Sequence, residues 1–268
     1  MGLEQINKRN ELITQWVLEA GKTIKDSFEK SIQVEEKSNR NDLVTEMDKK
    51  TEEMLIKNIR QHFPDERIFA EESDNEEIKD LNGVVWIIDP IDGTTNFIHQ
   101  RRNFAVSIGI YENGIGKMGF IYDVMNNELF HAAKGQGAFL NGRALERLER
   151  VRVSEAIIGL NAAWILANRR FDATILRDLV RDVRGTRSYG SAAIEIASVC
   201  AGRLDAYLSL RLSPWDIAAG LVLLGEVGGI ASNLRGEPLS LLQQNTVIFS
   251  KPGLYEDVFR DYLQEGRW

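Results

Sequence analysis

Cysteine and proline are scarce in this chain, and each shortage excludes a class of structure. The 268 residues contain one cysteine, which excludes an internal disulfide and a zinc site built from several thiolates. The five prolines argue against long disordered linkers. No apolar run approaches the ~20 residues that a membrane helix needs, and the N-terminus lacks the apolar core of a signal peptide. We therefore expect a cytoplasmic protein without a membrane partner.

A basic surface is missing as well. The net charge is −7, and the basic clusters, such as residues 101–102 and 147–152, are short. Since a nucleic-acid site needs a broad positive footprint, we do not expect nucleic acid as a partner. His62, His99 and His131 show no metal-ligand spacing, so we expect structural or surface roles for them.

The chain is long enough for one large α/β domain or two fused smaller ones. Apolar residues at helical spacing predict helices over 3–30 and 45–63. Short β segments alternate with turns from 104 to 140, which indicates an antiparallel meander, and the second half alternates strands with helices. We predict an N-terminal lobe over 1–150 and a C-terminal α/β lobe over 151–268, joined in one compact unit.

The stretch WIIDPIDGTTNFIH, residues 86–99, carries the most information. An apolar run over 84–88 stops at Asp89, and Asp92 follows three residues later. We expect a buried strand that delivers both carboxylates to a tight turn. Such a pair repels and is costly to bury unless a cation lies beside it. Oxygen ligands favour a hard divalent ion, Mg²⁺ first, over zinc.

Two further acids follow similar local signals. Glu71 comes directly after a short apolar strand, as Asp89 does. Asp216 lies in a helix-start signature, with Ser213 as the N-cap and Pro214 in the first turn. If the strands share a sheet, four acids converge. The alternative, left open by the residues alone, is that Asp216 only caps a helix and Glu71 is a surface acid.

These motifs resemble those of the inositol monophosphatase family. Residues 86–97 resemble its first signature, and residues 215–220, WDIAAG, resemble its second. Other segments resemble family segments in the expected order: Asp42 to Thr45 with Asp48, and residues 70–73, 134–142 and 187–193. The likeness covers nearly the whole chain.

The resemblance implies both a fold and an activity. The fold would be α/β, a five-layered αβαβα sandwich of the inositol monophosphatase and fructose-1,6-bisphosphatase type. The activity would be Mg²⁺-dependent hydrolysis of a small phosphomonoester, first of all inositol monophosphate, by metal-activated water. The resemblance also implies two to three Mg²⁺ ions, inhibition by lithium at a Mg²⁺ position, and a homodimer.

The family pattern also assigns the metal ligands. It implies that Glu71, Asp89 and the backbone carbonyl of Ile91 hold one Mg²⁺. Asp89, Asp92 and Asp216 would hold a second, and a third ion would share Glu71. Ions bridged by a carboxylate can stabilise the attacking and leaving oxygens of an in-line displacement.

The nucleophile is expected to be water, since no Ser/His or Cys/His pair indicates covalent catalysis. In the family a threonine hydroxyl and an aspartate orient or deprotonate that water, and the matching residues are Thr94 and Asp48, with Glu71 as a further catalytic residue. From the sequence alone, Asp48 is interpreted as an acid in the first turn of a helix, where its negative charge interacts favourably with the positive end of the helix dipole.

The expected substrate contacts combine two kinds of group. Free amides at Gly93 and Thr94 can face phosphate, and the resemblance adds the side chains and backbone of Asp92, Gly190, Ser191, Ala192, Ser209 and Asp216. Animal members carry a glutamate at the position of Ser209 that contacts inositol hydroxyls. Here that contact is lost or made through water.

Substrate choice therefore stays open. Relatives also use 3′-phosphoadenosine 5′-phosphate, the 2′-phosphate of NADP and fructose 1,6-bisphosphate. Arg211 is a candidate contact for a second phosphate or a nucleotide, or it is a plain surface arginine. An alternative that is not enzymatic is that the protein is a regulatory binding protein of the transcription machinery, a role that some bacterial relatives have.

Overall fold

The structure, a computed structural model of the chain, describes residues 1–29, 34–36, 43–73, 78–166 and 173–263. Its helices alternate with two sheets. The α-helices described are α1 (Leu3–Ser27), α2 (Glu46–His62), α3 (Thr94–Gln100), α4 (Ala173–Asp182), α5 (Ala192–Cys200), α6 (Pro214–Glu226) and α7 (Leu254–Asp261). None of these helices combines the length and apolar character that crossing a bilayer requires.

The larger sheet has seven strands and is antiparallel except at one edge, where β3 and β4 run parallel. Its strands, in spatial order, are β3 (Arg67–Ala70), β4 (Val84–Asp92), β5 (Ala105–Glu112), β6 (Ile115–Asp123), β7 (Glu128–Ala133), β8 (Gly137–Leu140) and β9 (Arg143–Ala144). The predicted meander over 104–140 is confirmed in β5 to β8, whose Asn-containing turns match the sequence signals.

The smaller sheet has five strands and mixes parallel with antiparallel pairs. Their spatial order is β11 (Gly185–Arg187), β10 (Ile157–Leu160), β12 (Ala206–Leu212), β14 (Asn245–Ser250) and β13 (Ile230–Ser232). A separate hairpin pairs β1 (Val34–Glu36) with β2 (Leu43–Thr45), and two short 3₁₀ turns are η1 (Val153–Glu155) and η2 (Ala162–Ile165).

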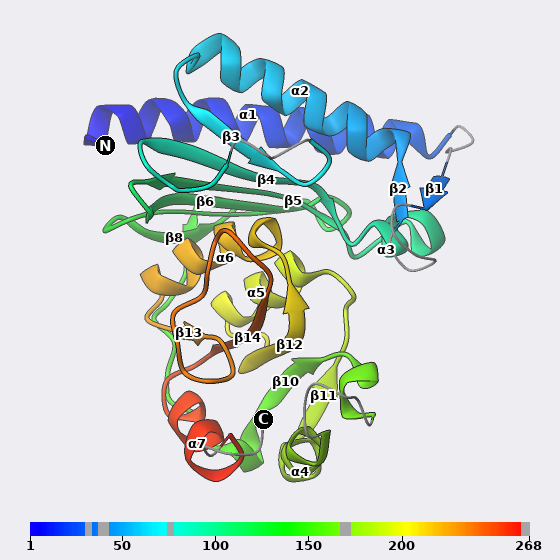
Figure 1. Cartoon of the computed structure of the whole chain (residues 1–268), viewed down its shortest axis with the longest axis vertical. Coiled ribbons are helices and arrows are strands. Elements are labelled where there is room, and N and C mark those ends of the chain that lie inside the picture. The colour runs from blue at the N-terminus through cyan, green and yellow to red at the C-terminus, as the bar shows by residue number, and fades with distance from the viewer. Residues whose placement is uncertain (30–33, 37–42, 74–77, 167–172, 264–268) are drawn as a thin grey trace.

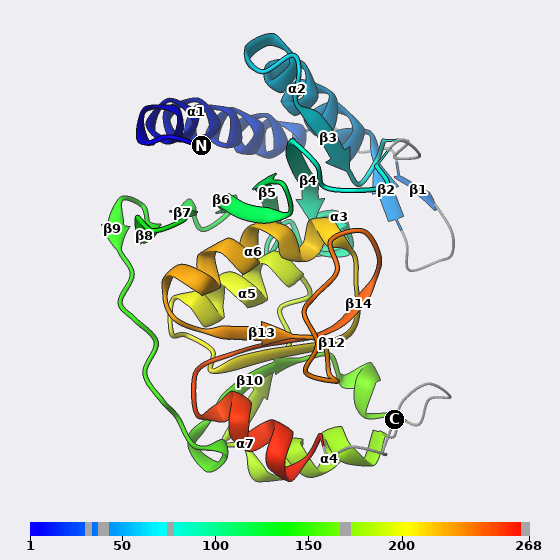
Figure 2. The same ribbon diagram turned by 60° about the vertical axis from the view of Figure 1, so that its left-hand side comes forward.

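These elements stack in five layers, as Figures 1 and 2 show. Helices α1 and α2 cover one face of the larger sheet, and α5 and α6 lie between the two sheets. Helices α4 and α7 cover the far face of the smaller sheet. The predicted αβαβα sandwich is confirmed.

Helix α6 lies unusually close to the larger sheet. A Cβ at Gly109 on β5 would lie 2.8 Å from the Cβ of Ala218, and one at Gly119 on β6 would collide with the backbone of Ala219. Glycine at these strand positions therefore lets the helix backbone approach the sheet. This approach sets the height above the sheet at which the first turn of α6, with Asp216, is held.

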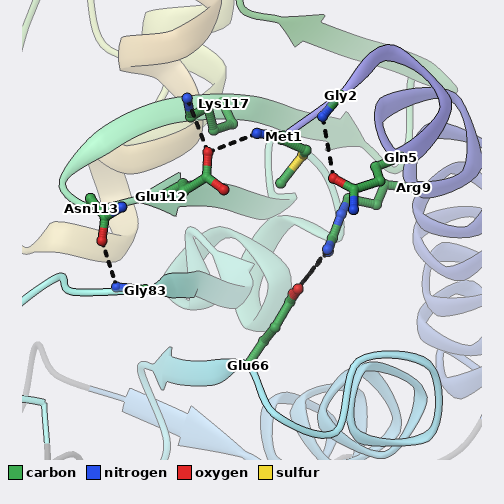
Figure 3. A network of polar contacts seen from close by, with 9 residues as sticks. All are labelled: Met1, Gly2, Gln5, Arg9, Glu66, Gly83, Glu112, Asn113 and Lys117. Carbon is green, nitrogen blue, oxygen red and sulfur yellow. Dashed lines mark hydrogen bonds and ion pairs between the residues drawn. The ribbon is translucent and has the colours of Figure 1, made fainter.

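The N-terminus is attached to the same sheet through ion pairs (Figure 3). The amino group of Met1 lies 2.9 Å from the carboxylate of Glu112 on β5, which also pairs with Lys117. Further along α1, the buried Arg9 makes two hydrogen bonds to Glu66, at 2.5 and 2.8 Å. A bidentate, partly buried pair is among the stronger ion pairs, and it fixes α1 against the segment that leads into β3.

Several predicted boundaries are wrong. The strand predicted to stop at Asp89 continues to Asp92, with a register shift between the two aspartates at Pro90, which lacks an amide for the ladder. Residues 34–36 form β1, a short strand that the sequence did not predict. The short elements α3, β11 and β13 were not predicted, because three to seven residues show too little periodicity.

His131 on β7 gives a testable pH dependence. Its ring stacks between Phe120 and Phe139 at centroid distances of 6.0 and 5.1 Å, and burial lowers the pKa of the imidazole. The unfolded chain then binds more protons than the folded one. The free energy of unfolding should therefore fall as the pH drops below about 6.5 and through the lowered pKa.

We expect His131→Leu to flatten the decline between pH 7.5 and 5.5, measured by urea unfolding across that range. The exposed His99 provides the matched comparison, His99→Leu, which also removes one imidazole but leaves the stack of His131 between Phe120 and Phe139 intact. Equal slopes for the parent and His131→Leu would contradict this assignment.

Candidate active site

Three carboxylates from distant parts of the chain meet at one corner. Asp89 and Asp92 lie at the C-terminal end of β4, and Asp216 lies in the first turn of α6. Each offers an oxygen that lies within 4.8 Å of those from the other two. The two strand aspartates are buried and Asp216 is half-buried. The convergence expected from the sequence is thus present for these three residues.

Glu71, the first residue after β3, lies at the same corner. Its backbone amide donates to the carbonyl of Ile88 at 3.1 Å, which continues the parallel β3–β4 pairing beyond Ala70. Its carboxylate contacts that of Asp89 and also acts on Asp216 through its charge. Glu71 is therefore part of the acidic corner rather than an isolated surface acid.

The corner is electrostatically unfavourable by itself. Burial, and then the charges of neighbouring carboxylates, raise the pKa values of Asp89 and Asp216 well above their usual range. Burial also raises the pKa of Asp92, while hydrogen bonds from Ser191 and the backbone oppose the rise. Clustered, oxygen-only donors of this kind fit a hard divalent cation, which would relieve both the burial and the repulsion.

Asp216 also caps its own helix. Its carboxylate accepts a hydrogen bond from the amide of Ser213 at 2.6 Å, which completes a capping box with Pro214 in the first turn. The two readings offered by the sequence are therefore compatible. The cap fixes the side chain, and the fixed side chain faces the strand aspartates.

Asp48 and Thr94 are hydrogen bonded to each other, although 46 residues separate them. The hydroxyl of Thr94 lies 3.1 Å from Asp48 Oδ1 and equally far from the carbonyl of Ile91. Asp48 Oδ2 accepts from the amide and hydroxyl of Thr45 at 2.8 and 2.5 Å. The fully buried Asp48 is thus both a capping acid of α2 and a partner of Thr94.

Gly93 provides bare backbone between β4 and α3. Its φ of 92° lies in the left-handed region, and a Cβ there would lie 3.1 Å from the Asn103 carbonyl oxygen and 3.1 Å from Ser191 Cβ. The position therefore requires glycine, and the chain turns here directly into the first residue of α3, Thr94.

A turn before α5 braces the corner from the second half of the chain. The hydroxyl of Ser191 donates to Asp92, and the amide of Ala193 donates to the same oxygen at 2.8 Å. Asn96 donates to the carbonyl of Tyr189 at 2.7 Å and so connects α3 to this turn. These bonds place Gly190, Ser191 and Ala192 beside Asp92.

A cavity of about 270 Å³ opens beside the acids. Asp92 and Asp216 line it together with predicted contacts Gly190, Ser191, Ala192, Ser209 and Arg211. The sequence analysis assigned no contact to six of the lining residues, namely Asn161, Trp164, Ser188, Glu195, Tyr207 and Leu212. Among them, only Glu195 could have been noticed in the sequence, because it is the one charged residue in the apolar stretch that forms α5. The predicted family segment that begins at Asp42 starts outside the described residues.

Glu195 is a buried carboxyl that lines this cavity. One oxygen accepts from the amide of Tyr189 at 2.5 Å, and burial raises the pKa of the group to about 7, against the opposing effect of the hydrogen bonds from Tyr189 and Gly190. Its bonds hold the turn before α5 from inside the protein.

Comparison with known proteins agrees with this geometry. The family model described as "Inositol monophosphatase family" matches residues 7–265. "Inositol-1-monophosphatase" of Bacillus subtilis (strain 168) is 52% identical over 95% of this chain and 96% of that protein. "Nus factor SuhB" of Escherichia coli (strain K12) is 40% identical over 85% and 86%.

A solved structure has the same fold and carries ligands. The "IMPase/NADP phosphatase complexed with Mg2+ and phosphate" superposes with a TM-score of 0.89 at 26% identity, over 98% of this chain and 97% of that one. Full-length sequence and structural similarity, together with the acidic corner, lead to one conclusion: the chain belongs to the inositol monophosphatase family of metal-dependent phosphoric monoester hydrolases.

Proposed function

We propose that this protein hydrolyses a small phosphomonoester with Mg²⁺ at the acidic corner, and that inositol monophosphate is its first candidate substrate. The observation that carries the proposal is the meeting of Asp89, Asp92 and Asp216, with Glu71 beside them. A buried group of like charges is favourable only with a cation. The name of the Bacillus subtilis relative supports the choice of substrate.

The proposed ligands are the four acids and the carbonyl of Ile91, for two to three Mg²⁺ ions. Bound Mg²⁺ supplies positive charge for the phosphoryl oxygens and lowers the pKa of water. The donor set fits this ion because it consists of oxygen atoms alone.

Thr94 and Asp48 act on the attacking water in this proposal. The Thr94 hydroxyl donates toward Asp48 Oδ1, so its oxygen lone pairs are available to accept a hydrogen bond from water. As water attacks phosphorus, its proton passes to the Thr94 oxygen and the Thr94 proton passes to Asp48. The backbone of Gly93 and Thr94, without a side chain at Gly93, can approach the phosphoryl oxygens.

A nucleotide phosphate is the second candidate, favoured by the cavity lining. Ser209 is buried and short, while Arg211 and Trp164 add a guanidinium and an indole to the lining of the same cavity. Those groups suit a second phosphate and a flat base better than a ring of hydroxyls. We therefore keep 3′-phosphoadenosine 5′-phosphate and NADP as alternatives, and also fructose 1,6-bisphosphate, which has a second phosphate but no base. The solved relative is named as an IMPase/NADP phosphatase.

A phosphate-release panel with and without Mg²⁺ tests both candidates. We expect release from at least one of these substrates with Mg²⁺, and none with a chelator. Ser209→Glu should raise kcat/KM for inositol 1-phosphate, relative to 3′-phosphoadenosine 5′-phosphate, by about 10-fold, because a carboxylate accepts hydrogen bonds from the ring hydroxyls. Ser209→Ala is the control and should not raise that ratio. No release from any phosphomonoester by metal-loaded protein would refute the proposed activity.

We also propose that residues 1–150 and 151–268 are two lobes of one catalytic unit that pairs as a homodimer. The division of the sheets between β9 and β10 supports the lobes, and the family resemblance supports the dimer. Light scattering across a concentration series measures the assembly state, and a mass near 30.3 kDa throughout would contradict the dimer.

A further inference from the structure

Glu52 is a buried carboxylate on α2 that lies outside the acidic corner. Only 3% of the surface of Glu52 is exposed to solvent. Both of its oxygens accept hydrogen bonds from the segment that follows Glu71. Oε2 accepts from the amide of Glu72 at 2.8 Å, and Oε1 accepts from the hydroxyl of Ser73. The helix thereby holds a segment about 20 residues further along the chain.

These contacts fix Glu71 from one side, while the sheet fixes it from the other. The Glu71 amide donates to the Ile88 carbonyl at the end of β4. The next amide in the chain, that of Glu72, donates to the carboxylate of Glu52. Two consecutive amides are thus bound to two different elements, and the Glu71 side chain extends from the point between them toward Asp89.

Burying a carboxylate is unfavourable unless its oxygens are hydrogen bonded. An apolar residue would serve a purely packing position on α2 without that cost. Glu52 instead directs both oxygens to backbone and side-chain donors immediately beyond a proposed metal ligand. Outer groups of this kind orient ligands, and their loss typically weakens metal binding 10–100-fold.

We propose that Glu52 is a positioning residue that orients Glu71 and thereby sets the affinity of the site for Mg²⁺. The inference rests on the proposed function, because it takes Glu71 as a ligand. Glu52 itself contacts neither the ion nor the substrate in this proposal.

Glu52→Ala, Glu52→Gln and the full-length parent provide the test. Calorimetric titration with Mg²⁺, without substrate, measures binding directly. We expect Glu52→Ala to weaken Mg²⁺ binding by about 10-fold or more. At saturating Mg²⁺, kcat should stay within about 3-fold of the parent, since a ligand that the ion itself pulls into place is present in the loaded state.

Glu52→Gln separates geometry from charge. Its side-chain oxygen can accept from the Glu72 amide, and its NH₂ group can donate to the Ser73 hydroxyl. We expect Mg²⁺ affinity within about 3-fold of the parent. The matched control is Glu53→Ala, which removes the same charge from the exposed neighbour on α2 and should bind as the parent does.

Three results would overturn the inference. One is parental affinity in a folded Glu52→Ala protein. Another is a Glu52→Gln protein as weak as Glu52→Ala, because Glu52 would then act through charge. The third is a parent that binds no Mg²⁺, which removes the proposed function as well and so differs from the first two. If Glu52→Ala fails to unfold cooperatively, Ser73→Ala removes one of the two bonds and should still weaken binding by a few-fold.

Discussion

Asp92→Asn should lower turnover at saturating Mg²⁺ by about a thousandfold or more, yet leave the metal-free protein at least as stable as the parent. The loss is expected because the substitution removes one of the charges proposed to hold Mg²⁺, and the ion would in turn stabilise the developing charge on phosphate. The stability follows because asparagine is nearly isosteric and reduces repulsion among buried acids. Its side-chain oxygen can still accept from Ser191 and Ala193.

Phosphate release and thermal unfolding, each with and without Mg²⁺, measure the two effects separately. The parent should gain stability on adding Mg²⁺ and the variant should gain less, because ligand binding stabilises only the state that binds. The matched control is Asp123→Asn, a buried aspartate of the same sheet that is bonded to Asn126 outside the corner. Near-parental turnover of Asp92→Asn would show the metal assignment to be wrong.

Thr94→Ala should lower kcat by about 100-fold or more while Mg²⁺ affinity stays close to that of the parent. The substitution removes the hydroxyl that lies between Asp48 and the proposed water, and a positioned proton acceptor contributes 10²–10⁴-fold in rate. None of the proposed ligands is the Thr94 side chain, so the ion should still bind.

The conservative variant Thr94→Ser keeps the hydroxyl and should recover most of the lost rate. Asp48→Asn should show a loss similar to Thr94→Ala, and the double variant should be little worse than either, because residues that act as a unit are not additive. Additive losses in the double variant would argue against a shared proton path. Single-turnover assays measure the rate loss of each variant, and Mg²⁺ titration measures whether its affinity for the ion has changed.

Local patterns predicted much of the fold. The helical spacing of apolar residues gave α1 and α2 to within three residues at each end, and alternating β segments gave the meander. The short β11 and β13 were missed because they exist only through pairing with longer neighbours. The extension of β4 to Asp92 likewise depends on its partner β5.

Some residues of the candidate site could likewise be predicted from local sequence, whereas others depend on tertiary structure. The two aspartates at the end of β4 are only three residues apart in the sequence, so their proximity is a local property. That Glu71 meets them depends on β3 lying beside β4 in parallel, which no pattern in the chain specifies. Asp216 needed the family resemblance, and Trp164 joins the cavity only through tertiary packing.

The close contact of α6 with Gly109 and Gly119 has a consequence for how the protein tolerates change. The helix that rests on this bare backbone also carries Asp216. A single added methyl group there would raise the helix and move the carboxylate away from its partners on β4. A substitution at this contact would therefore change both the packing of α6 on the sheet and the affinity of the proposed site for its ion, so natural selection for either property constrains the same two glycines.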